Sequence, residues 1–162
     1  EWFVKTNYTY IQSEVSGEGT VTVAQGAFGN PQALVLNAAG FIEDGRALQG
    51  QSEHLFNVQV GFETFDGRAR GALLYNYVSD RTRAVANLSD SLPEIVEQVP
   101  SSLDFVYSRT INVAEADWDV GFSVRNILGD GYSATQNAGG TELAVDTYDL
   151  GTTFSVSVSR TW

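Results

Sequence analysis

The sequence has no cysteine, a single histidine and no long apolar run. Each of these features argues against a particular class of protein or site. Without cysteine, the 162-residue chain has no disulfide framework and no thiolate metal site. It has no run of about 18 apolar residues, so we expect no transmembrane helix. A Ser-His-Asp catalytic arrangement would have to use His54. P-loop, G-x-G-x-x-G and H-E-x-x-H motifs are also missing, so we expect no enzyme activity, no cofactor and no metal site.

Basic residues are scarce as well. Nine Lys and Arg stand against 20 Asp and Glu, which gives a net charge of −11. Nucleic acid is therefore not expected as a partner, because its phosphates require a basic surface. Hydrophobic content of 43% and aromatic content of 12% nevertheless fit a folded chain whose length suits one domain.

The clearest pattern that is present is strict alternation over residues 152–162. Ser and Thr occupy one set of positions, and Phe154, Val156, Val158 and Trp162 occupy the other, where Arg160 is the exception. A β-strand places alternate residues on opposite faces, so this stretch predicts a strand with one hydroxyl face and one apolar face. Arg160 lies close enough to Trp162 to extend its charge into a lipid headgroup layer.

Five further stretches alternate in the same way, and together they predict an all-β chain of six main strands: residues 1–14, 48–65, 68–85, 102–111 and 118–128. Two connections are short, namely the hairpin signal Asp66-Gly67 and residues 112–117. Three are long loops at residues 15–47, 86–101 and 129–151, the first with short strands at 20–24 and 33–37. The connections therefore alternate between long and short.

This alternation, with aromatic residues near strand ends and isolated charges on the second face, is typical of an antiparallel transmembrane β-barrel. Such a barrel has short periplasmic turns, long extracellular loops and a polar interior. We expect His54 at the interface, and one set of side chains to face lipid: Phe56, Val58, Phe62, Tyr75, Phe105, Tyr107, Val120, Phe122, Val156 and Val158. The expected lumen-facing side chains are Glu63, Arg70, Asp104, Asp119 and Arg125.

The long loops hold most of the negative charge, with ten acidic residues against Arg46: Glu18, Glu43, Asp44, Asp90, Glu94, Glu97, Asp130, Glu142, Asp146 and Asp149. Two interpretations stay open for them, a solvated surface and a mouth that attracts cations. The alternative to a barrel is a soluble β-sandwich binding module that uses these long acidic loops for recognition.

Six strands are too few for a closed barrel, which starts at about eight. An open edge in lipid would leave backbone groups without hydrogen-bond partners. We therefore expect the six strands to belong to a larger barrel or to pair with another chain, with a barrel formed by two copies as a further possibility.

Several motifs occur in a characteristic order: residues 7–15, 72–78 followed by Arg81 and Arg83, 92–98, 102–108, 124–128 and 151–159. Together they resemble the C-terminal part of a TonB-dependent outer-membrane receptor, and they extend over nearly the whole chain. This sequence departs from the family in ending with Trp162, where Phe is most common.

The resemblance implies that residues 1–162 form the last six strands of a 22-stranded barrel in the bacterial outer membrane. The plug domain and the N-terminal strands would then lie outside this sequence. The family imports a scarce ligand such as an iron chelate, a vitamin or a carbohydrate-type solute. The implied partners are the remainder of the barrel, the plug, lipid and lipopolysaccharide, with TonB acting only through the plug.

In that family, alternate apolar positions that end in a terminal aromatic residue form the signal for barrel assembly. The resemblance therefore assigns this role to Phe154, Val156, Val158 and Trp162. An amphipathic terminal strand can add to an exposed sheet edge of the assembly machinery, which gives the signal a physical basis. The alternative is that Trp162 only anchors the strand at the membrane interface.

Overall fold

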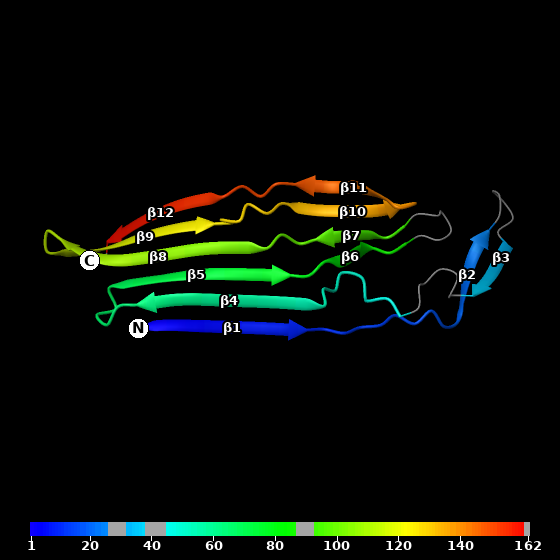
Figure 1. Ribbon diagram of the computed structural model, residues 1–162, viewed down its shortest axis with the longest axis horizontal. Helices are drawn as coiled ribbons and strands as arrows, with labels where there is room; N and C mark the ends of the chain where they lie inside the picture. The colour runs from blue at the N-terminus through cyan, green and yellow to red at the C-terminus, as the bar shows by residue number, and fades with distance from the viewer. Residues whose placement is uncertain (26–31, 38–44, 87–92, 161–162) are drawn as a thin grey trace.

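The computed structural model describes residues 1–25, 32–37, 45–86 and 93–160, and the regular elements in this part of the chain are β-strands. The main sheet has six antiparallel strands in the order β1-β4-β5-β8-β9-β12 (Figure 1). Their bounds are Trp2–Tyr10, His54–Glu63, Ala69–Val78, Ser102–Val113, Ala116–Arg125 and Thr153–Arg160. The all-β prediction is confirmed, and each of the six alternating stretches contains one of these strands.

Two strand boundaries differ from the prediction. The strand predicted from residue 48 begins only at His54, because residues 48–50 turn and Gly50 has a φ of +78°. The strand predicted over residues 68–85 divides at Ser79 and Asp80 into β5 and β6, which belong to different sheets. Alternation alone does not reveal such a break, since both pieces remain extended.

Both short connections lie at one end of the main sheet, which we call the turn end; the opposite end is the loop end (Figure 1). In the first connection, Asp66 accepts hydrogen bonds from the Thr64 hydroxyl at 2.6 Å and the Arg68 backbone at 3.1 Å. The Thr64 hydrogen bond lowers the pKa of the Asp66 carboxyl. The second connection is the pair Ala114 and Glu115, whose φ values of 53° and 62° suit a two-residue hairpin turn.

The long connections contain more strands than predicted. Strands β6 (Arg81–Ala84), β7 (Ile95–Gln98), β10 (Tyr132–Ala138) and β11 (Thr141–Tyr148) form a second sheet in the order β11-β10-β7-β6. Figure 1 shows this outer sheet continuing beyond the loop end of the main sheet. The prediction of plain loops over residues 86–101 and 129–151 is therefore wrong. Strands β2 (Thr20–Gln25) and β3 (Gln32–Asn37) form a separate hairpin, close to the two short strands predicted there.

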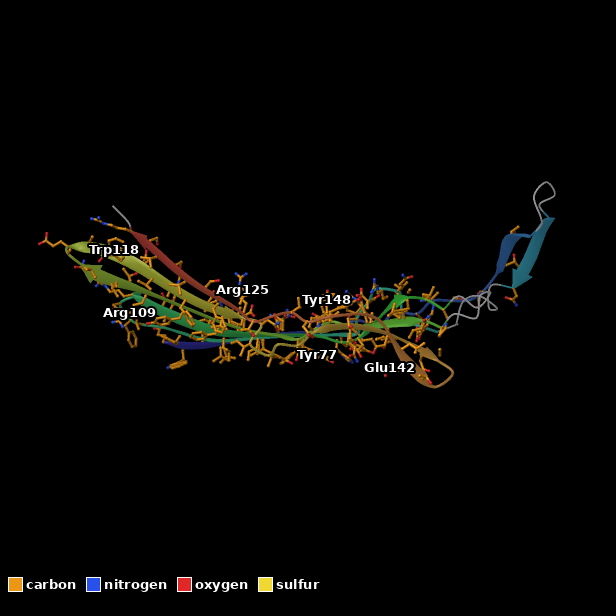
Figure 2. All side chains as sticks on the ribbon, turned by 90° about the horizontal axis from the view of Figure 1, so that it is seen from above. Tyr77, Arg109, Trp118, Arg125, Glu142 and Tyr148 are labelled. Atoms are coloured by element: carbon orange, nitrogen blue, oxygen red, sulfur yellow. The ribbon has the colours of Figure 1, made fainter. Side chains whose placement is uncertain are left out.

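The described residues build no hydrophobic core. Seen along its edge, the molecule is a single layer (Figure 2). Ala72 and Ala134 are the buried hydrophobic residues of the described part, where no large side chain is fully buried. A sandwich would bury one face of the sheet against a second sheet, and the main sheet has no such layer over either face in the described part.

The main sheet is also open. Strand β1 pairs with β4 and β12 pairs with β9, so β1 and β12 are its two outer strands and the described strands form no closed barrel. In the part of the chain that the structure describes, no helix is long and apolar enough to cross a membrane.

Candidate functional site

The strand register sorts the side chains of the main sheet into two faces. On the apolar face, Trp2 pairs with Phe62, Val60 with Leu73, and Leu73 with Phe105. The row continues through Phe105 to Val124 and Phe154. All ten side chains predicted to face lipid share this face.

The apolar face is extensive and uncovered in the described structure. Trp2 is 79% exposed, and on the opposite outer strand Val156 is 72% exposed. The positions in register on this face include no Asp or Glu within the six described strands. The charged side chains on this face of the described strands are Arg109 and Arg160, both near the turn end. His54 lies on the same face at the loop end.

Aromatic residues lie at both ends of the apolar face in two groups that we call belts, and further rings such as Phe105 and Phe122 lie between them. At the turn end, the ring centroids of Trp2 and Phe62 lie 5.3 Å apart, and Arg160 lies 5.5 Å from the ring centroid of Trp118. At the loop end, His54 stacks with Tyr10, and its Nδ1 lies 2.9 Å from the Tyr8 hydroxyl. The nine residues of Trp2–Tyr10 give eight rises of about 3.4 Å, or about 27 Å of strand and about 21 Å of height at a tilt of about 40°. This height is close to the apolar band of about 25 Å in membrane barrels.

The opposite, polar face holds all five predicted lumen residues. At the turn end, Glu63 is paired in register with Arg70, whose Nε donates to the Ser108 hydroxyl at 2.9 Å. Asp119 accepts from the Thr110 hydroxyl at 2.5 Å. Toward the loop end, Asp104 accepts from the backbone N–H of Asn126 at 2.9 Å, which supports the turn after β9.

Arg125 completes this group. It ends strand β9, and Figure 2 labels it on the other side of the sheet from Tyr77. The five residues therefore share one face but lie in two groups, near the turn end and toward the loop end. Their lumen-facing role stays a prediction.

The polar face carries two hollows toward the turn end. A hollow of about 520 Å³ is lined by residues of β1, β4, β5 and β8, including Lys5, Glu63 and Arg70. A second hollow of about 460 Å³ continues across β9 to Ser157 and Ser159. The second hollow is lined mainly by polar side chains and suits water or a polar partner, whereas Phe3 and Val106 give the first a largely apolar lining.

The outer sheet contains a hydrogen-bonded network that the sequence did not reveal. Glu97 on β7 accepts from Arg81 Nε on β6 and from the Tyr132 hydroxyl on β10, both at 2.5 Å. Arg83 donates to the Tyr132 hydroxyl at 3.2 Å and to Asp146 on β11 at 3.1 Å. One network thus links all four strands of the outer sheet, and Glu97 is only 9% exposed.

These contacts shift two pKa values in opposite directions. The hydrogen bond from Tyr132, helped by Arg81, holds the pKa of Glu97 below its usual range, although partial burial acts against it. The same hydrogen bond to Glu97 raises the pKa of the Tyr132 hydroxyl. Two of the ten loop acids, Glu97 and Asp146, are therefore ion-paired rather than simply solvated. Glu43, Asp44 and Asp90 lie outside the described residues.

The proposed assembly signal falls on the outer strand β12. Phe154, Val156 and Val158 lie on the apolar face, in register with Val124, Phe122 and Val120 of β9. They are 60–72% exposed because no further described strand covers them. Trp162 lies outside the described residues.

Comparison of the chain with family models, with curated proteins and with solved structures gives no match. The resemblance to TonB-dependent receptors therefore stays a hypothesis that rests on the motifs in the sequence.

The Glu97 network predicts a pH dependence of the outer sheet. Because the folded-state pKa of Glu97 is lowered, its contribution to stability is present above the unfolded value of about 4.5 and is lost as the pH falls through the folded value. Hydrogen-exchange protection of the β7 and β10 amides, corrected for intrinsic rates, should decline below about pH 4.5 more steeply in the wild type than in Glu97→Gln. Parallel curves for the two proteins would contradict this assignment.

Proposed function

We propose that this chain forms part of the barrel wall of a TonB-dependent active transporter in the bacterial outer membrane. The imported ligand would be a scarce solute such as an iron chelate, a vitamin or a carbohydrate. One observation carries the proposal: a single-layer sheet presents a continuous apolar face between two aromatic belts and has no described hydrophobic core.

The size of the apolar face favours lipid as its cover. Six strands about 4.8 Å apart and about 27 Å long give a projected area of about 780 Å². Monomeric soluble proteins rarely expose a contiguous apolar patch above this size. Lipid tails would cover the patch without any second protein layer, and the belts at its two ends match the membrane interfaces.

The two outer strands favour a larger barrel. Strands β1 and β12 each present an edge that no described strand pairs with. In lipid such an edge is costly, because its N–H and C=O groups find no water to bind. Further strands would pair with both edges and close the wall, and the polar face with Glu63, Arg70, Asp104, Asp119 and Arg125 would then line the interior.

The family resemblance adds the transport role. It supplies the expected 22-stranded barrel, the plug inside it and the contact with TonB through that plug. In this arrangement the short turns lie in the periplasm, and the outer sheet and the β2–β3 hairpin extend outside the cell. The acidic residues of the long connections would then surround the entrance.

A pair of arginine substitutions on β12 tests the wall. Val156→Arg places a charge on the apolar face, and it should destabilise the membrane-inserted protein by about 2–4 kcal/mol if that face meets the middle of the bilayer. Ser155→Arg, one residue away on the polar face, is the matched control and should cost little. The amount of protein in isolated outer membranes and its unfolding midpoint in urea measure both effects. Equal effects of the two substitutions would argue against a lipid-covered apolar face.

Uptake tests the transport role. Cells lacking the protein should take up one of three radiolabelled ligands, a ferric chelate, a cobalamin or an oligosaccharide, only at the rate of passive diffusion. Removing TonB from cells that contain the protein should lower the uptake of the same ligand to the same level. Unchanged uptake of all three ligand classes would contradict the transport role. The role of the chain as barrel wall is tested separately by the two arginine substitutions.

A further inference from the structure

The charged side chains on the apolar face are positive, whereas the chain as a whole is negative. The chain carries a net charge of −11. On the apolar face of the six described strands, however, the side chains of fixed charge are Arg109 and Arg160, both toward the turn end. A third cation, Arg68, lies in the adjoining turn. The two turns also hold Asp66 and Glu115, so the turn end of the apolar face together with its turns carries a small net positive charge within an acidic protein.

Two of these arginines share a hollow. It has a volume of about 590 Å³, and its lining includes Arg68, Arg109 and the apolar-face residues Phe62, Tyr107 and Ile111. Ala69 pairs in register with Arg109, and the backbone of Thr110 donates to the carbonyl of Arg68 at 2.7 Å. This pairing holds Arg109 of β8 beside Arg68 in the turn before β5, at the edge of one concave surface where both side chains are exposed.

Neither arginine forms an ion pair with a described residue. The nearby Asp66, which also lines the hollow, already accepts from the Thr64 hydroxyl and the Arg68 backbone. Glu63 lies on the polar face, where it and Asp119 line a second hollow that Arg68 and Arg109 also border. The Asp66 carboxylate attracts Arg68, but neither guanidinium is held in an ion pair with a described residue, so an anion could bind both where the apolar face ends.

We propose that this hollow binds the phosphate headgroup of an anionic glycerophospholipid in the leaflet next to the short turns. The inference rests on the proposed membrane location of the sheet. Arginine suits this ligand because its planar fork of N–H donors matches phosphate oxygens, and charge-assisted hydrogen bonds of this kind are strong. The acyl chains would continue along the apolar face past Phe62 and Tyr107. The positive turn end thereby fixes the depth of the wall in the bilayer.

The test is a lipid titration of the full-length protein that carries this chain, in neutral detergent, with phosphatidylglycerol as the probe and native mass spectrometry as the readout. At roughly fivefold in affinity per arginine, Arg68→Gln with Arg109→Gln should weaken binding about 25-fold. Arg70→Gln with Arg125→Gln removes the same charge from the polar face and should leave binding unchanged. Arg68→Lys with Arg109→Lys should recover only part of the affinity, since the charge remains but the planar fork of donors is lost.

Equal weakening in the two glutamine variants would overturn the site, because it would show an effect of net charge alone. Unchanged binding in Arg68→Gln with Arg109→Gln would overturn it as well. Should that variant fail to fold, the wild type still decides: phosphatidylglycerol should bind more tightly than diacylglycerol, which lacks the phosphate, and equal binding of the two would reject the site. The membrane location is tested separately. Recovery of the wild type in the soluble fraction without detergent would reject that location, whatever the lipid titration shows.

Discussion

The register of the main sheet is the constraint on which the rest of this structure depends. A shift of one residue in any strand would move its apolar side chains to the other face. The pairs Val60–Leu73, Leu73–Phe105 and Phe105–Val124 instead keep one face apolar across four adjacent strands. Because no second layer covers this face in the described structure, the register creates a surface that requires a partner.

The proposed partner explains features that a soluble sheet would not need. Lipid supplies the apolar medium that a core would otherwise provide, so a single layer is sufficient. The two aromatic belts and the arginines of the turn end then fall at the interfaces, where amphipathic side chains are favoured. The Glu97 network has a different role, since it holds four strands together beyond the loop end, where water competes for every hydrogen bond.

The sequence predicted those parts of the fold that depend on period-2 alternation. The six main strands and the sharing of one face by Phe56, Tyr75 and Phe105 follow from that pattern. The turn at Asp66-Gly67 was predicted from its hairpin signal, although the connection has five residues rather than two. Strands β10 and β11 were missed although Gly139-Gly140 is a two-residue hairpin signal, with φ values of 61° and 84°. Their alternation is weak because neither face of the outer sheet is uniformly apolar.

One of the two candidate sites could be predicted from the sequence and the other could not. The faces of Glu63, Arg70, Asp104, Asp119 and Arg125 were predictable because each residue lies within an alternating strand. The Glu97 network was not, since it joins Arg81, Tyr132 and Asp146 across sequence separations that only the strand order β11-β10-β7-β6 brings together. No local pattern in the sequence encodes that order.

The most direct measurement of the central claim is a spin-label scan along β8, from Ser102 to Ser108, in the membrane-embedded full-length protein. Collisions with oxygen, which dissolves in lipid, should be most frequent at Leu103, Phe105 and Tyr107. Collisions with a water-soluble nickel complex should be least frequent at those three positions, so the two profiles alternate out of phase. Low oxygen accessibility at all three apolar positions would show that protein covers this face, and it would contradict the account.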